Sequence, residues 1–237
     1  ASYFGFALDL PALRERLRHR QDQEPTRLRL TCDPQGRVEL TASAVSTPRS
    51  QTLHCLTGEP WRLKVVPDSV HSQDLFLRHK TTHRLAYDTA RQSAPAADDV
   101  ILVNERGECT ETSIGNLAVL LRGQWLTPPI DCGLLAGTLR SELLASGELV
   151  EAPITPQDLP RSDALAILNS VRGVIPAIAL LESSWVSLHQ KRPASAHRRK
   201  NALSLRNISL ARLRILLRRI KQTTVLIAPT ALHVIQP

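Results

Sequence analysis

The sequence predicts a fold that contains both helices and strands, because segments with helical periodicity are interspersed with short strand-like runs. The strand-like runs are rich in Val, Ile and Leu, and turns containing Gly, Pro, Asn or Asp separate them. A chain of 237 residues of which 42% are hydrophobic can bury a core of this kind. The sequence has no internal repeat.

The first elements along the chain are a helix, a hairpin and a strand. The helix is predicted over residues 7–20, with Asp9 as its N-cap and Pro11 in its first turn. Residues 26–43 alternate in polarity on both sides of a D-P-Q-G turn, which is typical of a β-hairpin. Residues 61–67, "WRLKVVP", predict a further strand.

The later elements combine helices with buried strands. Residues 74–92 begin with a short apolar turn and continue with a helical pattern. Residues 98–129 predict three short strands, with turns at "NERGE" and "RGQ". A helix is predicted to begin after Gly137 and to end near Gly147. Residues 163–180 then predict a buried strand, a polar corner and a further apolar segment.

The last fifty residues differ from the rest of the chain in charge. Residues 188–237 hold 11 of the 30 Lys and Arg and none of the 22 Asp and Glu, so their net charge is +11 and that of residues 1–187 is −3. Within this tail, residues 205–222 have the pattern of a basic amphipathic helix. Such a tail could bind nucleic acid or an acidic membrane surface, or be a solvated extension. Nucleic-acid binding is not expected, because no aromatic side chains interleave with the arginines.

Motifs that are missing exclude several classes of protein. No apolar run approaches the ~20 residues of a membrane span, and the N-terminus lacks the pattern of a signal peptide. The four cysteines, Cys32, Cys55, Cys109 and Cys132, form no C-x-x-C pair and have no partnered histidine, so neither disulfides nor a zinc site is expected. We therefore expect a cytoplasmic protein without a metal. Because the sequence contains no methionine, we also expect that Ala1 is not the natural start.

Lys80, in the stretch "FLRHKTTHR", is the first candidate for catalysis. It is one of only two lysines among residues 1–187, which contain 17 arginines. Lysine, unlike arginine, can lose its proton near neutral pH and attack a carbonyl group. An isolated lysine is usually a surface charge, so the case for Lys80 depends on three later motifs.

The first of these motifs is "ECTETSIGNLAVLL", in which Glu111 lies on a strand predicted to be buried. A buried carboxylate needs a partner, and the strand has no basic residue. The partner is expected to be a protonated ring nitrogen of a cofactor or an arginine from another element. The second motif, "CGLLAGTLRSELL", opens a helix with Gly137 and Thr138. Helix N–H groups, the helix dipole and a hydroxyl can bind a phosphate, although Gly-Thr is also a common helix cap.

The third motif is "ILNSVRG", which follows a predicted buried strand. The Ser170 hydroxyl can add a phosphate contact, and Arg172 can bind a substrate carboxylate with two parallel hydrogen bonds. The alternative is an ordinary polar turn with an exposed arginine.

The four motifs together resemble the class IV aminotransferase family, the fold type IV pyridoxal-phosphate enzymes. The resemblance lies in their order and spacing: Lys80 in "HKT", Glu111 in "ETSIGN" 31 positions later, Thr138 in "LLAGTLR" 27 further on and Ser170 in "NSVRG" 32 beyond that. It is specific over residues 60–180, looser over residues 1–50, and does not extend to residues 188–237.

The resemblance implies a role for each matching residue. Lys80 would bind the aldehyde of pyridoxal 5'-phosphate covalently and move protons on the substrate, Glu111 would pair with the pyridine nitrogen, and Leu134 would pack on the ring. The phosphate would be bound by Gly137, Thr138 and Ser170. Asn116 completes an E-x-x-x-x-N pattern as a supporting residue. Burial and the nearby Arg78 and Arg84 are expected to lower the basicity of Lys80. Arg172 would hold a substrate carboxylate or be structural.

Within the family, the sequences of three stretches most resemble those of the aminodeoxychorismate lyases: "YFGFALDLPALRERL", "HKTTHRLAYDTAR" and "NERGECTETSIGN". These enzymes convert 4-amino-4-deoxychorismate to 4-aminobenzoate and pyruvate in folate biosynthesis. Two alternatives stay open: a branched-chain or D-amino acid aminotransferase of the same fold, and an inactive fragment or binding module that acts through the basic tail. The resemblance further implies a homodimer, and a fusion or association with aminodeoxychorismate synthase.

The family fold implies two α/β domains with the cofactor between them. Residues 1–70 are expected to form part of the small N-terminal domain, and residues 71–187 the larger cofactor-binding domain with a barrel-like sheet. Residues 188–237 match nothing in the family. The resemblance implies that the family begins earlier, with a strand that carries F-E-T-x-R-like residues and a segment with an arginine that contacts the phosphate. Neither precedes Ala1 in this sequence, so the N-terminal domain is expected to be truncated.

Overall fold

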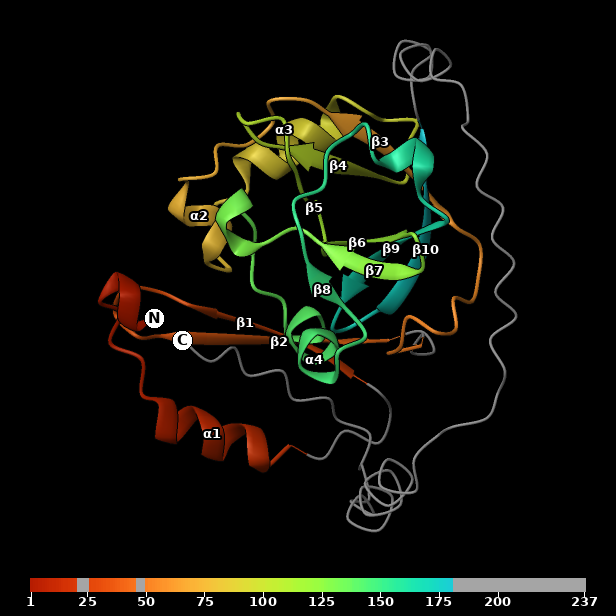
Figure 1. Cartoon of the computed structure of the whole chain (residues 1–237). Coiled ribbons are helices and arrows are strands. Elements are labelled where there is room, and N and C mark those ends of the chain that lie inside the picture. The colour runs from red at the N-terminus through yellow and green to blue at the C-terminus, as the bar shows by residue number, and fades with distance from the viewer. Residues whose placement is uncertain (21–25, 46–49, 181–237) are drawn as a thin grey trace, which may run out of the picture. The chain divides into compact units, whose positions relative to one another are not determined.

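The computed structural model describes residues 1–20, 26–45 and 50–180 (Figure 1). The described chain divides into two compact units, residues 1–44 and residues from 45 onward, which are treated separately below. The predicted basic linker and the amphipathic helix over residues 205–222 lie outside the described residues.

The first unit contains the predicted helix and hairpin. Its elements are a 3-10 turn at Ser2–Phe4, helix α1 at Leu10–Arg18, and the antiparallel strands β1 at Thr26–Cys32 and β2 at Val38–Ala44. The predicted cap is confirmed, because the Asp9 carboxylate accepts a hydrogen bond from the Ala12 N–H at 2.9 Å. Helix α1 buries Leu13 and Leu17, one turn apart.

The second unit is built around an eight-stranded sheet with the order β5-β4-β3-β10-β9-β6-β7-β8. An additional pairing of β5 with β6 closes six of these strands into a ring, and β7 and β8 extend the sheet beyond it (Figure 1). The strands are β3 Trp61–Val66, β4 Asp99–Val103, β5 Cys109–Thr112, β6 Asn116–Leu121, β7 Gln124–Thr127, β8 Val150–Glu151, β9 Ala164–Asn169 and β10 Gly173–Leu180. The barrel-like sheet implied by the resemblance is therefore present.

Three helices accompany this sheet: α2 Leu75–Arg78, α3 Leu85–Gln92 and α4 Thr138–Ser146. Two 3-10 turns lie at Ile130–Cys132 and Leu159–Arg161. Alternate residues of the strands face opposite sides of the sheet. On β4, Ile101 belongs to the core cluster to which every strand of the ring contributes, whereas Leu102 packs with Tyr87 and Ala90 of α3. Helix α4 packs on β9 in a separate cluster.

Two details of the predicted elements were wrong. Residues 98–129 contain four strands, because a tight turn after β5 separates it from β6. In this turn the Thr112 N–H donates to the Gly115 carbonyl at 2.8 Å. A Cβ added at Gly115 would lie 2.5 Å from the Leu168 carbonyl oxygen, so glycine allows the turn to approach β9. Residues 74–92 form two helices, and the six residues between them include Lys80.

The compact units divide at residue 44, whereas the sequence interpretation put the domain boundary at residue 70. Strand β3 pairs with β4 and β10 and so belongs to the barrel.

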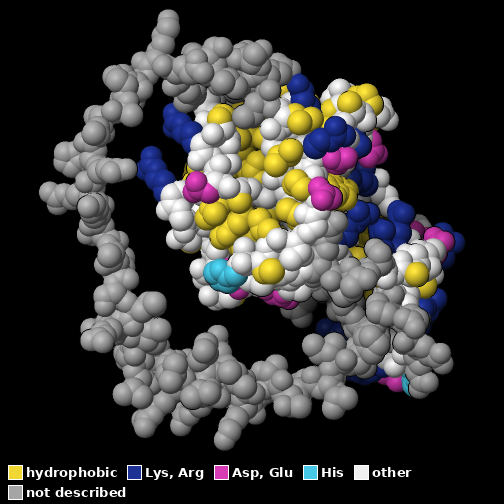
Figure 2. Space-filling view, turned by 90° about the vertical axis from the view of Figure 1, so that its right-hand side faces the viewer, with side chains coloured by type: hydrophobic (Ala, Val, Ile, Leu, Met, Phe, Trp, Pro, Cys, Tyr) yellow, Lys and Arg dark blue, Asp and Glu magenta, His cyan; other side chains and the backbone are white. Residues whose placement is uncertain are grey.

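Figure 2 shows one face of the larger unit, on which hydrophobic side chains gather. Within the described part of the chain, no helix combines the length and apolar character needed to cross a membrane.

Candidate active site

The Glu111 carboxylate is the centre of a buried polar cluster at the junction of β5 and β6. Its side chain is 4% exposed. Oε1 accepts hydrogen bonds from the Tyr87 hydroxyl at 2.7 Å and from the Leu135 N–H at 3.1 Å. Oε2 accepts one from the Asn116 amide at 3.1 Å. The sequence prediction of a buried carboxylate is confirmed, and all three of these donors are uncharged.

The surroundings of Glu111 make its carboxyl easier to protonate than that of an exposed glutamate. Burial raises the pKa of Glu111 to about 7, against the opposing effects of the hydrogen bonds from Tyr87 and Leu135 and of the charges on Lys80 and Arg84. Burial and the neighbouring carboxylate raise the pKa of Tyr87 well above its usual value, so its hydroxyl remains a donor. A cation placed beside Glu111 would therefore favour the ionised carboxylate.

Lys80 lies in the connection between α2 and α3, close enough for its charge to act on Glu111. Its side chain is exposed, whereas the sequence interpretation expected burial to lower its basicity. Arg84, four residues later, is held over the Tyr87 ring with its guanidinium carbon 4.7 Å from the ring centre. It also donates to the Ser113 carbonyl at 2.7 Å, which ties this connection to the end of β5.

The N-terminus of α4 is held against the same cluster. The Asn116 amide that donates to Glu111 also donates to the Leu135 carbonyl at 2.7 Å. A Cβ added at Gly137 would lie 2.2 Å from Asn116 Oδ1, so only glycine permits this approach. Within the described residues, no side chain caps α4, and the buried Thr138 hydroxyl has no hydrogen-bond partner. Leu134, just before this segment, is fully buried.

The third motif forms the turn between β9 and β10. Leu168 pairs with Asn116 across the strands, which brings the end of β9 to the edge of the sheet that carries Glu111. The Asn169 amide donates to the Ile114 carbonyl at 2.6 Å, and Ser170 follows in the turn. Arg172 is exposed, and its guanidinium carbon lies 5.6 Å from the centre of the Trp61 ring. The described contacts of Arg172 therefore do not join it to the Glu111 cluster.

Two donors to Glu111 were missed by the sequence interpretation, the Tyr87 hydroxyl and the Leu135 N–H. Tyr87 carried a usable signal, since it lies on the apolar face of a predicted helix, where a buried phenol needs a hydrogen-bond partner. No sequence signal indicated the Leu135 N–H, because every residue except proline has a backbone N–H and the side chain does not show which group it will contact.

Comparisons with known proteins agree with this arrangement. Residues 7–180 match the family described as amino-transferase class IV, so the chain belongs to this family of enzymes. A crystal structure of a Mesorhizobium loti protein, provisionally described as an amino-acid aminotransferase, is 36% identical with a TM-score of 0.66. The match covers 76% of this chain and 86% of that one.

Curated relatives are similar over a shorter stretch. A Schizosaccharomyces pombe protein provisionally named aminodeoxychorismate lyase is 33% identical over 111 residues, which are 44% of this chain and 48% of that protein. The aminodeoxychorismate lyase of Saccharomyces cerevisiae is 28% identical over 113 residues, 44% of this chain and 30% of that protein. The chain thus spans half or less of the length of these two relatives.

Proposed function

We propose that this chain binds pyridoxal 5'-phosphate and catalyses the conversion of 4-amino-4-deoxychorismate to 4-aminobenzoate and pyruvate. The cofactor proposal rests on Glu111, a buried carboxylate within reach of the Lys80 charge, whose three hydrogen-bond donors are neutral. The choice of reaction is supported by the two relatives named as aminodeoxychorismate lyases.

The described residues fit the two ends of this cofactor. The three hydrogen-bond donors to Glu111 are neutral, and a protonated pyridine nitrogen beside the carboxylate would add a positively charged donor. At the other end, a phosphate would accept hydrogen bonds from the Thr138 hydroxyl, which has no partner within the described residues, and from N–H groups in the first turn of α4, which no described side chain caps. We assign Gly137, Thr138 and Ser170 to the phosphate and Leu134 to the ring face.

The reaction would use the chain's own groups as follows. Bound pyridoxal phosphate withdraws electrons from the substrate carbon that bears the amine. The Lys80 amine would hold the cofactor aldehyde and, once the substrate amine replaces it, would remove a proton from that carbon. The electron pair released from that carbon would expel the neighbouring enolpyruvyl group with its ether oxygen, and the ring would become aromatic. The departing enolpyruvate would take up one proton, equal in number to the one removed, and so become pyruvate. Glu111, fixed by Asn116 and Tyr87, would keep the ring nitrogen charged, and Arg172 is assigned to a substrate carboxylate.

An amino-acid aminotransferase is the second candidate, and the Mesorhizobium loti structure favours it, since it matches more of the chain than the lyase relatives do. The two reactions differ in their products. Incubation with aminodeoxychorismate and pyridoxal phosphate is expected to release 4-aminobenzoate and pyruvate in equal amounts without a keto acid. Turnover that requires a keto acid, with transfer of the amino group, would contradict the lyase proposal and support an aminotransferase.

The proposal extends to the surroundings of the enzyme. We place it in the cytoplasm as a homodimer in folate biosynthesis, fused to or associated with aminodeoxychorismate synthase. Sedimentation of the purified chain, with and without the synthase, tests the assembly.

The Thr138 hydroxyl gives a test of the phosphate site. A buried hydroxyl without a partner costs free energy, so Thr138→Val is expected to leave the cofactor-free chain equally stable or more stable by about 1 kcal/mol. Its dissociation constant for pyridoxal phosphate is expected to rise about tenfold, since a hydrogen bond to a charged group is lost. Denaturant unfolding and a spectroscopic titration measure the two quantities.

Thr127→Val is the matched control. The buried Thr127 hydroxyl donates to the Leu117 carbonyl at 2.7 Å, so its removal should destabilise the chain and leave cofactor affinity nearly unchanged. If Thr138→Val binds the cofactor as tightly as the unmodified chain, the hydroxyl does not contact the phosphate.

A further inference from the structure

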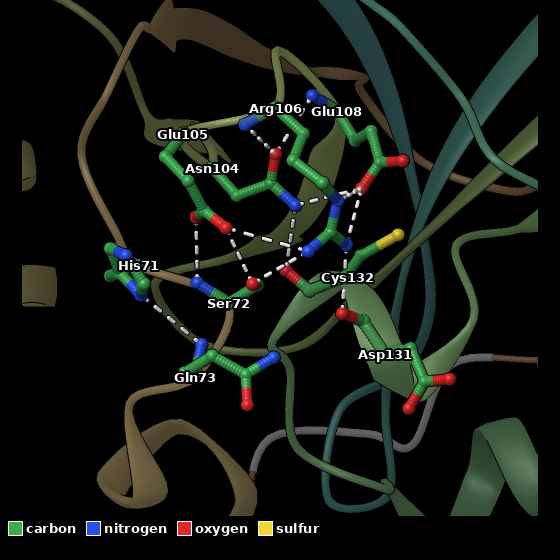
Figure 3. A network of polar contacts seen from close by, with 9 residues as sticks. All are labelled: His71, Ser72, Gln73, Asn104, Glu105, Arg106, Glu108, Asp131 and Cys132. Atoms are coloured by element: carbon green, nitrogen blue, oxygen red, sulfur yellow. Dashed lines mark hydrogen bonds and ion pairs between the residues drawn. The ribbon is translucent and has the colours of Figure 1, made fainter.

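The turn between β4 and β5 holds Arg106 at the centre of a polar network (Figure 3). Its guanidinium donates to Glu108 Oε2 from Nε at 2.9 Å and from Nη2 at 2.7 Å. Nη1 donates to the Ser72 hydroxyl at 2.6 Å, and Nη2 also donates to the Asp131 carbonyl at 2.8 Å. One side chain thus joins three segments that are distant in the sequence.

Each of these segments is followed, within eight residues, by a residue that we assign to the candidate active site. Ser72 precedes Lys80 by eight residues, Glu108 precedes Glu111 by three, and Asp131 precedes Leu134 by three. The guanidinium therefore lies where the parts of the chain that carry the lysine, the carboxylate and the approach to α4 converge.

Other contacts hold the same three segments together. The Asn104 amide donates to the Cys132 carbonyl and to Glu108, both at 2.9 Å. Glu105 accepts from the Ser72 N–H at 2.8 Å and from its hydroxyl at 2.6 Å. These two Ser72 donors lower the pKa of Glu105 to about 2, so it remains ionised in the network. Figure 3 shows these groups pointing toward one another around Arg106.

The backbones themselves approach closely at this point. A Cβ added at Gly133 would lie 2.7 Å from Ser72 Cα, and Gly133 has a φ of +87°. Ser72 is fully buried. A shift of either segment would therefore be transmitted to the other. Single exposed ion pairs contribute little to stability, but the planar guanidinium here satisfies a carboxylate, a hydroxyl and a carbonyl in one geometry.

We propose that Arg106 is a positioning residue, which fixes the segments carrying Lys80, Glu111 and the α4 N-terminus relative to one another without touching the cofactor. The measurements with pyridoxal phosphate rest on the proposed function, whereas the hydrogen-exchange measurements on the cofactor-free chain do not. A displacement of well-placed groups by about 1 Å can cost up to ~100-fold in rate, so a residue remote from the chemistry can matter in this way.

The test compares Arg106→Gln and Arg106→Lys with Arg62→Gln. Arg62 also donates to a carboxylate, Asp98, at 3.3 Å and to a carbonyl, that of Ala96, at 3.0 Å, and its side chain is similarly exposed. In the cofactor-free chain, both Arg106 variants are expected to increase amide hydrogen exchange in residues 71–80 and 131–138. Arg62→Gln should leave these segments unchanged.

With the cofactor, both Arg106 variants are expected to bind pyridoxal phosphate about tenfold more weakly and to shift the pH midpoint of its visible band. Lysine retains the charge but not the planar fork, so it should not restore the original values. Amide exchange that rises only within residues 104–108, or full restoration of the original values by Arg106→Lys, would overturn the proposal.

If the unmodified chain binds no cofactor, the proposed function fails, and the exchange data still show whether Arg106 holds the three segments in place. If Arg106→Gln does not fold, Arg106→Lys and Ser72→Ala provide the same comparison.

Discussion

Lys80→Ala is expected to abolish formation of 4-aminobenzoate, with a loss of about 10³-fold or more in kcat. The variant removes the only group that we assign both to the cofactor aldehyde and to proton transfer. Because the Lys80 side chain is exposed, its removal creates no buried cavity, and the unfolding free energy should change by no more than about 0.5 kcal/mol. Product release measured alongside denaturant unfolding separates catalysis from stability.

Lys64→Ala is the control for this experiment. Lys64 is the other lysine of residues 1–187 and lies on β3. It should retain substantial activity when corrected for the folded fraction. Equal losses in the two variants would show that the effect at position 80 is not specific to the proposed chemistry.

Glu111→Gln is expected to reduce kcat by roughly 100-fold or more, since a neutral amide cannot hold the pyridine nitrogen protonated. Activity close to that of the unmodified chain would contradict the role of Glu111. Asp99→Asn is a suitable control, because Asp99 is equally buried but accepts its hydrogen bonds from Ser113 and the Val100 N–H.

Glu111→Gln also tests the pKa of Glu111, through the pH dependence of the free energy of unfolding. Glu111 loses its proton at about pH 7 in the folded cofactor-free chain but near its usual value of 4.5 when unfolded. Between these pH values the folded state holds a proton that the unfolded state has released, so its stability falls as pH rises and levels off above pH 7. The contribution of this group amounts to about 3 kcal/mol across the window. The stability of Glu111→Gln minus that of the unmodified chain should rise by this amount, and a constant difference would contradict the assigned pKa.

Local signals were sufficient to predict most of the elements. Asp9 and Pro11 mark the start of α1, the D-P-Q-G turn marks the hairpin, and Gly137 and Gly147 bracket α4. The turn that separates β5 from β6 was missed. Its glycine is required because the backbone of β9 lies close by, and proximity in space has no signature in the local sequence.

The sequence could propose site residues where a side chain type carries the chemistry. Lys80, Glu111, Gly137 and Thr138 were predicted from the order and spacing of their motifs. In the structure Glu111 and Gly137 both lie against Asn116, and Thr138 follows Gly137 at the start of α4. The partners of Glu111 depend on how α3 and the loop before α4 pack on the barrel, so the sequence did not reveal them. The position of Arg172 over Trp61 likewise arises from the pairing of β10 with β3.

Borohydride reduction of the chain loaded with pyridoxal phosphate tests the central claim most directly. Reduction makes the bond between cofactor and lysine permanent, and peptide mass spectrometry then locates it. We expect loss of the visible band and one phosphopyridoxyl group per chain, on Lys80. Labelling of Lys64 instead, or equal labelling of several lysines, would contradict the assignment of Lys80 and Glu111 to a pyridoxal phosphate site.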